Sequence, residues 1–286
     1  MKKLVLAVVA MLVMAVSCVF AAKHEPQVNW DRGLQGNVEV YGLGSPLDYT
    51  GYKGSRIGRE SAIMDGVRNL TAFVNTIHVD AHLTVGDLVA SNDGVKSGVS
   101  DLIRSAKIAA EGKNPDGTYW ARLSLPLYGN NSLADVVIPA VAAQSGKAQV
   151  AKLNKKNSII GRAGFEGVER DFYTGLVIDA RGLGLNCAFA PVIYDTAGRY
   201  IFGARFVNIN VANRGIVEYV RNSATINTGR SRAGDSPLVV KAETVRGGYA
   251  ANMVDIVVSE EDGDRILLAN NMNGYIFNNG AIVVMR

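Results

Sequence analysis

The sequence predicts an α+β protein of two domains, each a small mixed or antiparallel sheet packed with helices. The chain has 286 residues, 48% of them hydrophobic, which is enough for two cores. Each half contains stretches in which apolar residues recur at the spacing of a helix and stretches in which they alternate as in a strand. A stretch typical of a linker, 146–167, separates the halves. The predicted domains are 23–130 and 168–286, joined by a helix and linker at 131–167.

The N-terminus has the pattern of a secretory signal peptide, which we place at residues 1–22. A charged start, Met-Lys-Lys, precedes the apolar run Leu4–Val16, which is too short for a comfortable membrane span. Two processing routes stay open. Cleavage after Ala21 yields a soluble exported protein, whereas lipidation of Cys18 in a weak lipobox tethers the chain to a membrane. Cleavage is favoured because the usual Leu three residues before the cysteine is absent.

Charge and cysteine content exclude several classes of function. The formal net charge of +4 includes two signal-peptide lysines, and nucleic acid is not an expected partner. The basic cluster Lys152, Lys155 and Lys156 is interpreted as a solvated linker. Besides Cys18 the chain has only Cys187, whose apolar neighbours favour an inert buried thiol. No cofactor is expected.

The first domain is predicted in the order strand, helix, strand, helix, hairpin, with the long helix covering one sheet face. The helix follows a Gly/Tyr-rich loop of about a dozen residues. Alternation at 77–85 predicts a strand, and Asn114–Gly117 is a turn sequence. The apolar stripe of the helix is Ile63, Val67, Leu70, Val74 and Ile77. The expected elements are strand 38–41, a helix from 59, strand 77–85, helix 96–104 and hairpin strands 106–111 and 119–126.

The second domain is predicted to begin after a helix at 132–143, capped by Ser132, and the linker. Ser259 opens a capping box for a helix that ends near Asn271. Because this helix lies between two strands, we expect the strands before and after it to form a parallel pair. The expected strands are 173–178, 187–194, 200–202, 255–258 and 281–285, the second and third forming a hairpin.

A metal site is one interpretation of His78, Asp80 and His82, which share one face of the predicted strand. Residues four apart on a strand are, however, about 13 Å apart at Cα, too far to share one ion easily. We therefore interpret these side chains as an exposed polar face opposite a buried apolar one, and we expect no metal.

Asp179, Arg181, Gly182 and Gly184 follow an apolar strand and form the most distinctive short motif of the chain. A phosphate-binding glycine loop must lead into a helix N-terminus, and here another strand-like run follows. The acid and the guanidinium are instead interpreted as a structural pair at a strand end, with the glycines allowing the turn. A catalytic acid beside an anion clamp is the alternative interpretation.

The region from Val38 to Tyr128 resembles the Lpp20-type envelope lipoproteins and the N-terminal domain of flagellar assembly protein T. The resemblance rests on two motifs, the opening of the long helix and the end of the hairpin. The helix motif is matched by Arg59, Ala62, Asp65, Arg68, Asn69 and Leu70. The hairpin motif is matched by Gly117, Ala121, Leu123, Leu125, Pro126 and Leu127. The second half looks like an uncharacterised α/β region of longer relatives.

The resemblance implies a non-enzymatic protein of the cell envelope, in the periplasm or associated with the outer membrane. We expect it to bind envelope or flagellar proteins as a structural or assembly factor, with self-association left open and membrane contact only if Cys18 is lipidated. A periplasmic enzyme or ligand-binding protein, with its site near Asp179, Arg181 and Gly182, is the alternative.

The signal peptide gives a direct test by mass spectrometry of the mature protein. We expect an unmodified N-terminus at Ala22 or Lys23, because the lipobox lacks its usual Leu. A diacylglycerol adduct on Cys18 would contradict cleavage and support membrane anchoring.

Overall fold

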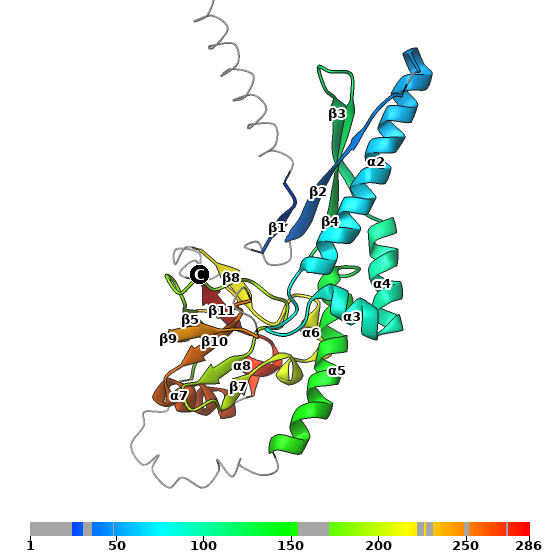
Figure 1. Ribbon diagram of the computed structural model, residues 1–286. Coiled ribbons are helices and arrows are strands. Elements are labelled where there is room, and N and C mark those ends of the chain that lie inside the picture. The colour runs from blue at the N-terminus through cyan, green and yellow to red at the C-terminus, as the bar shows by residue number, and fades with distance from the viewer. Residues whose placement is uncertain are drawn as a thin grey trace, which may run out of the picture. The chain divides into compact units, whose positions relative to one another are not determined.

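The computed structural model describes residues 25–30, 36–47, 49–153, 172–221, 226, 231–248, 252–272 and 274–286. It confirms the α+β class (Figure 1). The predicted signal peptide with Cys18 lies outside the described residues, and so does the predicted linker from residue 154 onward. Among the described residues, no helix has the length and apolar character needed to cross a membrane.

The chain divides into two compact units that are not sequential. Of the described residues, unit 1 contains those up to Val28 and those within Val38–Phe73 and Ile103–Leu125. Unit 2 contains the described residues within Asn29–Asn37, Val74–Leu102 and Pro126–Arg286. Residues 74–102, assigned from the sequence to the first domain, therefore pack with the second unit.

Unit 1 is a four-stranded sheet with one long helix on one face (Figure 1). The strand order is β1 (Gln27–Asn29), β2 (Asn37–Gly44), β4 (Tyr119–Pro126) and β3 (Lys107–Lys113). The antiparallel hairpin β3–β4 is confirmed, with the predicted turn closed by a hydrogen bond from Gly117 N to Asn114 O. The covering helix is α2 (Gly51–Thr76).

The predicted loop before α2 is too long, because the helix already begins at Gly51. The buried stripe also differs from the prediction. Ile63 and Val67 are only half-buried, whereas small residues at spacings of four face the sheet. The buried positions of α2 are Gly54, Gly58, Ala62, Gly66, Leu70 and Val74. Hydrophobic periodicity found Leu70 and Val74 but missed the other four positions, because glycine and alanine carry little hydrophobic signal.

Small residues let α2 and β2 approach to backbone contact. A Cβ added at Gly42 would lie 2.1 Å from both Ala62 O and Gly66 N, and one at Gly44 would lie 2.2 Å from Gly58 O. No side chain fits in such a space, so glycine is required by close approach.

The segment predicted as strand 77–85 is a compact loop instead. His78 and Thr84 form an isolated bridge, and Asp80 Oδ1 accepts hydrogen bonds from the backbone N–H groups of His82 and Leu83, at 2.8 Å each. This Asx-type turn replaces strand pairing. The predicted burial is right only in part: Ile77, Val79 and Ala81 are buried, but Leu83 is half-buried, and so are His78 and Asp80 on the predicted exposed face. Turn chemistry at Asp80 therefore overrode the strand-like alternation.

Helices α3 (Val85–Ser91) and α4 (Asp93–Arg104) follow this loop. Thr84 and Asp87 form a reciprocal capping box that starts α3, a helix the sequence analysis did not predict. Helix α5 (Leu133–Leu153) begins as predicted after Ser132, whose hydroxyl accepts from Asp135 N at 3.3 Å. The helix was predicted to end at 143, so residues 146–153, which were predicted as linker, are helical instead.

Unit 2 contains a seven-stranded mixed sheet in the order β7-β6-β10-β9-β5-β11-β8. Its long strand β9 (Pro237–Arg246) pairs in parallel with β5 (Gly175–Asp179) through its first half. Its second half pairs antiparallel with β10 (Asp255–Val258). The remaining strands are β6 (Ile193–Asp195), β7 (Tyr200–Phe202), β8 (Glu218–Val220) and β11 (Ile282–Met285).

The short helical elements of unit 2 are η3 (Ala204–Phe206), α6 (Ile209–Ala212), α7 (Glu260–Asn271) and α8 (Tyr275–Asn278). Helix α7 has the predicted bounds, and Ser259 accepts from Asp262 N at 3.0 Å. Two strand predictions were wrong. Residues 187–192 are not a strand, and β10 and β11 do not form a parallel pair. The strands β9 and β5 separate them, and the pairing directions make them antiparallel.

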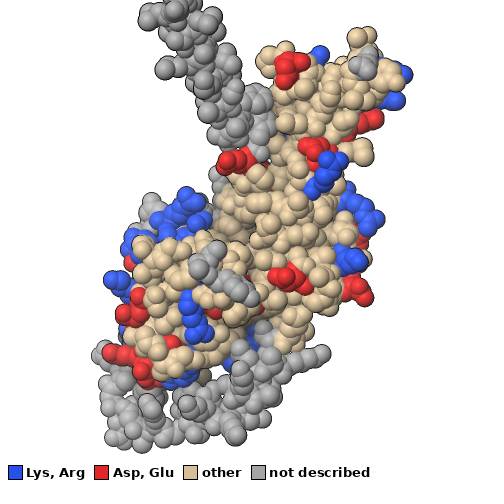
Figure 2. Space-filling model, in the orientation of Figure 1, with Lys and Arg blue, Asp and Glu red and all other residues tan. Residues whose placement is uncertain are grey.

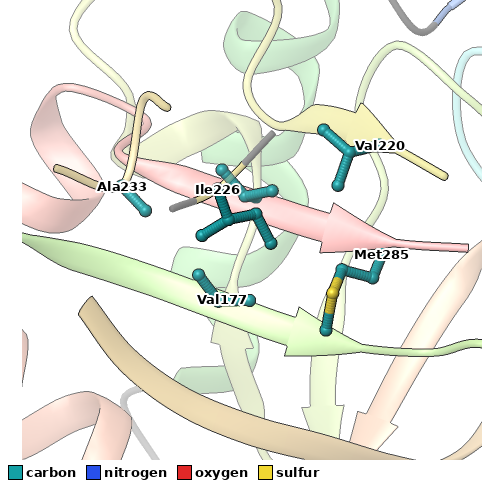
Figure 3. Packing of buried hydrophobic residues seen from close by; sticks show 6 residues of the cluster. Val177, Val220, Ile226, Ala233 and Met285 are labelled. Atoms are coloured by element: carbon teal, nitrogen blue, oxygen red, sulfur yellow. The ribbon is translucent and has the colours of Figure 1, made fainter. Parts of the chain in front are cut away.

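One face of the β5–β11–β8 half-sheet carries the apolar cluster drawn in Figure 3. Val177, Val283 and Met285 come from the strands, and Ile226 and Ala233 from the segment after β8. All are at most 9% exposed. This packing fixes the end of the sheet at which Asp179 lies.

The contact between α2 and β2 yields a stability prediction. We expect Gly42→Ala to lower the free energy of unfolding by about 3 kcal/mol, because the new methyl would force the helix off the strand. Chemical denaturation measures this. The control Glu60→Ala, on the exposed side of α2, should change stability by no more than about 0.5 kcal/mol. Equal stability of the Gly42 variant and the wild type would refute the close contact.

Candidate functional site

Asp179 and Arg181 pair with each other at the end of β5. Arg181 Nε donates to Asp179 Oδ1 at 2.8 Å and Nη2 to Oδ2 at 2.6 Å, while the Arg181 backbone N–H also donates to Oδ1. The bidentate guanidinium lowers the pKa of Asp179 below its ordinary value, and Lys241, next to it in register on β9, acts in the same direction. The carboxylate is thus ionised at neutral pH and engaged as an acceptor, which suits a structural role better than acid catalysis.

The two glycines of this motif supply backbone conformation. Gly182 has φ 79° and Gly184 has φ 71°, and no heavy atom lies within 4 Å of a Cβ added at either position. Glycine is therefore favoured at both positions by the left-handed backbone conformation and not by a lack of space for a side chain. The turn they form leads into the segment of Cys187, a thiol only 9% exposed.

The residues of the former metal interpretation do not converge on one ion. Among the described residues, no group of three or more His, Cys, Asp or Glu side chains could hold a metal. The Asp80 carboxylate accepts a hydrogen bond from the backbone N–H of His82 within the turn. The His82 ring packs against Gly248, and a Cβ added at Gly248 would lie 2.4 Å from His82 Nδ1. The Nδ1 atom of His78 is buried without a hydrogen-bond partner. The side chains of His78, Asp80 and His82 therefore lie in different surroundings and do not form one polar face.

Sequence reasoning missed two buried carboxylates in unit 2. Asp195 is 2% exposed, and its Oδ2 accepts from Arg199 Nε at 2.7 Å. Arg199 in turn bridges to Asp264 on α7 at 2.7 Å, so this network holds the β6–β7 hairpin to the helix. Asp255 is 3% exposed and accepts from Val192 N at 2.9 Å. The turn sequence after Asp195 could have indicated that this carboxylate has a structural role. No pattern in the sequence indicated that Asp255 is buried.

Three residues of the resembling helix motif, Ala62, Asp65 and Asn69, lie at the contact between α2 and β2 in unit 1. Asp65 Oδ2 accepts from Leu43 N at 3.0 Å, and Asn69 donates to Tyr41 O at 2.8 Å. Strand β1 has only three residues and can cover only part of the eight-residue β2. These side chains therefore satisfy backbone groups on β2 in place of strand pairing. This part of the motif has a structural explanation in this chain.

Unit 1 leaves several large apolar side chains exposed near the start of α2. Leu47 is 67% exposed, Tyr49 45% and Tyr52 85%. We call these three residues the apolar end. Clustered exposed apolar and aromatic groups mark interaction surfaces more often than scattered ones do. The apolar end is the strongest candidate for a functional surface in the part of the chain that the structure describes.

Charges near the apolar end are balanced rather than of one sign. Arg59 Nε lies 2.8 Å from a Glu111 oxygen, and Arg56 lies 3.7 Å from Glu60. Figure 2 shows a largely uncharged surface on this side of unit 1, with both blue and red side chains at its margin. A polar rim with compensated charges around an apolar centre is the usual anatomy of a protein interface.

The glycine turn after β5 yields the next prediction. We expect Gly184→Val to lower the free energy of unfolding by about 1–2 kcal/mol, since a β-branched residue resists positive φ. Gly184→Asn is the matched control and should cost a fraction of this, because Asn tolerates the left-handed region. Denaturant unfolding distinguishes the two, and equal losses would contradict a conformational role.

The second half of the chain is similar to a known protein domain. A search of curated proteins found no match. One family model, described as the second domain of Treponema pallidum Tp0624, matches residues 175–286. The match begins at the first residue of β5 and includes every strand of the seven-stranded sheet. The resemblance at 38–128 lies outside it and stays a prediction. Residues 175–286 are thus similar to the second domain of Tp0624.

Proposed function

We propose that this chain is a non-enzymatic, exported protein of the cell envelope that binds other proteins. In this role it acts as a structural or assembly factor of an outer-membrane or flagellar structure. The observation that carries the proposal is the apolar end, Leu47, Tyr49 and Tyr52, each at least 45% exposed. Tyrosine is enriched among residues that dominate binding energy at protein interfaces.

The exposed edge of the four-stranded sheet is poorly suited to pair with a partner strand, which favours recognition through side chains. Strand β3 is an edge of the four-stranded sheet, and an open edge can accept a partner strand. Its pairing with β4 is interrupted by a bulge between Ile108 and Ala110, and Lys107 and Lys113 lie at its ends. Bulges and lysines are common means of preventing strand addition. A partner at this end of unit 1 is therefore expected to contact the apolar end.

The conformation around the apolar end supports a preformed surface. The Leu47 N–H donates to Ser45 Oγ at 3.2 Å, and the Tyr49 N–H donates to Pro46 O at 3.3 Å. The Lys53 ammonium lies 4.0 Å from the centre of the Tyr49 ring, a cation–π contact. Holding exposed apolar groups in one arrangement lowers the entropic cost of binding.

Site-specific photo-crosslinking in the native host tests the proposal. A photo-reactive residue placed at Tyr49 or Tyr52 should give one discrete protein adduct, the same from both positions. Met64 is the matched control, because it lies on α2 outside the apolar end and is 70% exposed. We expect Leu47→Ser to reduce the adduct on the order of tenfold, as the loss of one interface contact does, with unchanged stability. Adducts equal in kind and yield from Met64 would refute the apolar end as the binding surface.

A further inference from the structure

Residues 77–84 dock onto the body of unit 2 through backbone hydrogen bonds at three places. Phe189 N donates to His78 O at 3.2 Å, Ala190 N to Val79 O at 2.7 Å and Gly248 N to Ala81 O at 3.0 Å. The three donors come from two separate segments, one before β6 and one after β9. The loop is therefore held as a unit, and these three amides report whether it is docked.

A small apolar contact seals the docked loop. Ala81, Ala188 and Val254 form a buried cluster in which no member is more than 2% exposed. Val254 immediately precedes Asp255, so the loop lies over the start of β10. Ile77 and Val79 of the loop are buried as well, so docking combines apolar burial with the three backbone hydrogen bonds, and nearby charges act in addition to both.

Asp255 is the unusual group beneath this contact. Its side chain accepts from Val192 N, and the residue is 3% exposed. The charged groups that face it are Asp80 and His82 from the loop and Arg246 from the end of β9. Tyr194 on β6 and Tyr200 on β7 lie in the same cluster. Arg246 is shared, since its guanidinium carbon stacks 3.3 Å from the centre of the Tyr194 ring.

Burial, opposed by the Val192 hydrogen bond and reinforced by the Asp80 charge, raises the pKa of Asp255 to about 6. An ionised Asp255 is thus disfavoured in the docked state by lost hydration and by a second carboxylate on the loop itself. Asp80 lies on the loop, so undocking of the loop removes this charge from the surroundings of Asp255.

We propose that residues 77–84 form a pH-sensitive latch, which docks firmly while Asp255 is protonated and loosens when Asp255 and Asp80 are both ionised. This device is independent of the partner proposed for the apolar end, because every residue in it belongs to unit 2.

The direction of the effect follows from proton linkage. A carboxyl group whose pKa is raised in the docked state strengthens docking most below its ordinary pKa of 3.8. That contribution is lost as the pH rises through about 6. Docking is therefore firm under acidic conditions and weakest at neutral pH and above.

Hydrogen exchange measured by NMR on the full chain tests the latch. Between pH 4.5 and pH 7, with exchange corrected for its intrinsic pH dependence, protection at Phe189, Ala190 and Gly248 should fall roughly tenfold. Reference amides at Leu176 and Ala180, which bond across β5 and β11, should change much less. In Asp255→Asn, which keeps an acceptor for Val192 N but cannot ionise, the fall at the three amides should disappear.

A second measurement keeps the test independent of that variant's folding. Carboxyl ¹³C shifts of the wild type should give Asp255 a pKa well above its ordinary value, and Asp80→Asn should bring it down by removing one neighbouring charge. An ordinary pKa for Asp255, or an undiminished pH dependence at the three amides in Asp255→Asn, would overturn the proposal.

Discussion

Strand β9 is the element on which the architecture of unit 2 depends. Its first half pairs in parallel with β5 and its second half antiparallel with β10, so one strand of ten residues joins two half-sheets of different character. The register shift opposite Val257 and Val258 lies in the second half, and the buried positions change phase there from Ala242 to Val245. A bulge of this kind re-aims side chains without ending the strand. Without β9 the hairpin β6–β7 and the pair β5–β11 would share no sheet.

The same strand sets the surroundings of two carboxylates. Its first half brings Lys241 beside Asp179, which is partly exposed, paired with Arg181 and kept ionised. Its second half brings Arg246 opposite Asp255, which is buried and whose pKa is raised. The pKa values of the two acids differ because solvent and the bidentate guanidinium of Arg181 stabilise the charge of Asp179, whereas burial destabilises the charge of Asp255. A group kept at such a cost is a reasonable place for a conformational switch.

Unit 1 uses a different constraint, close approach of backbones. Gly42 and Gly44 on β2 meet Gly58, Ala62 and Gly66 on α2, and the polar side chains of Asp65 and Asn69 satisfy the strand where β1 does not cover it. This contact fixes the start of α2 and with it the apolar end, whose exposed Leu and Tyr side chains carry the proposed protein-binding role.

The sequence by itself determined the α+β class, the hairpin β3–β4, the caps at Ser132 and Ser259 and the strands at 200–202 and 255–258, because these depend on local spacing and on hydrogen bonds to near neighbours. It also placed Asp179 and Arg181 together at a strand end, two residues apart. Only the tertiary structure decided the order and direction of the strands in unit 2, the interleaving of the two units, and the burial of Asp255. The reason is physical: strand pairing and desolvation depend on residues far apart in the chain, such as Asp80 and Asp255, and no local pattern records which of them meet.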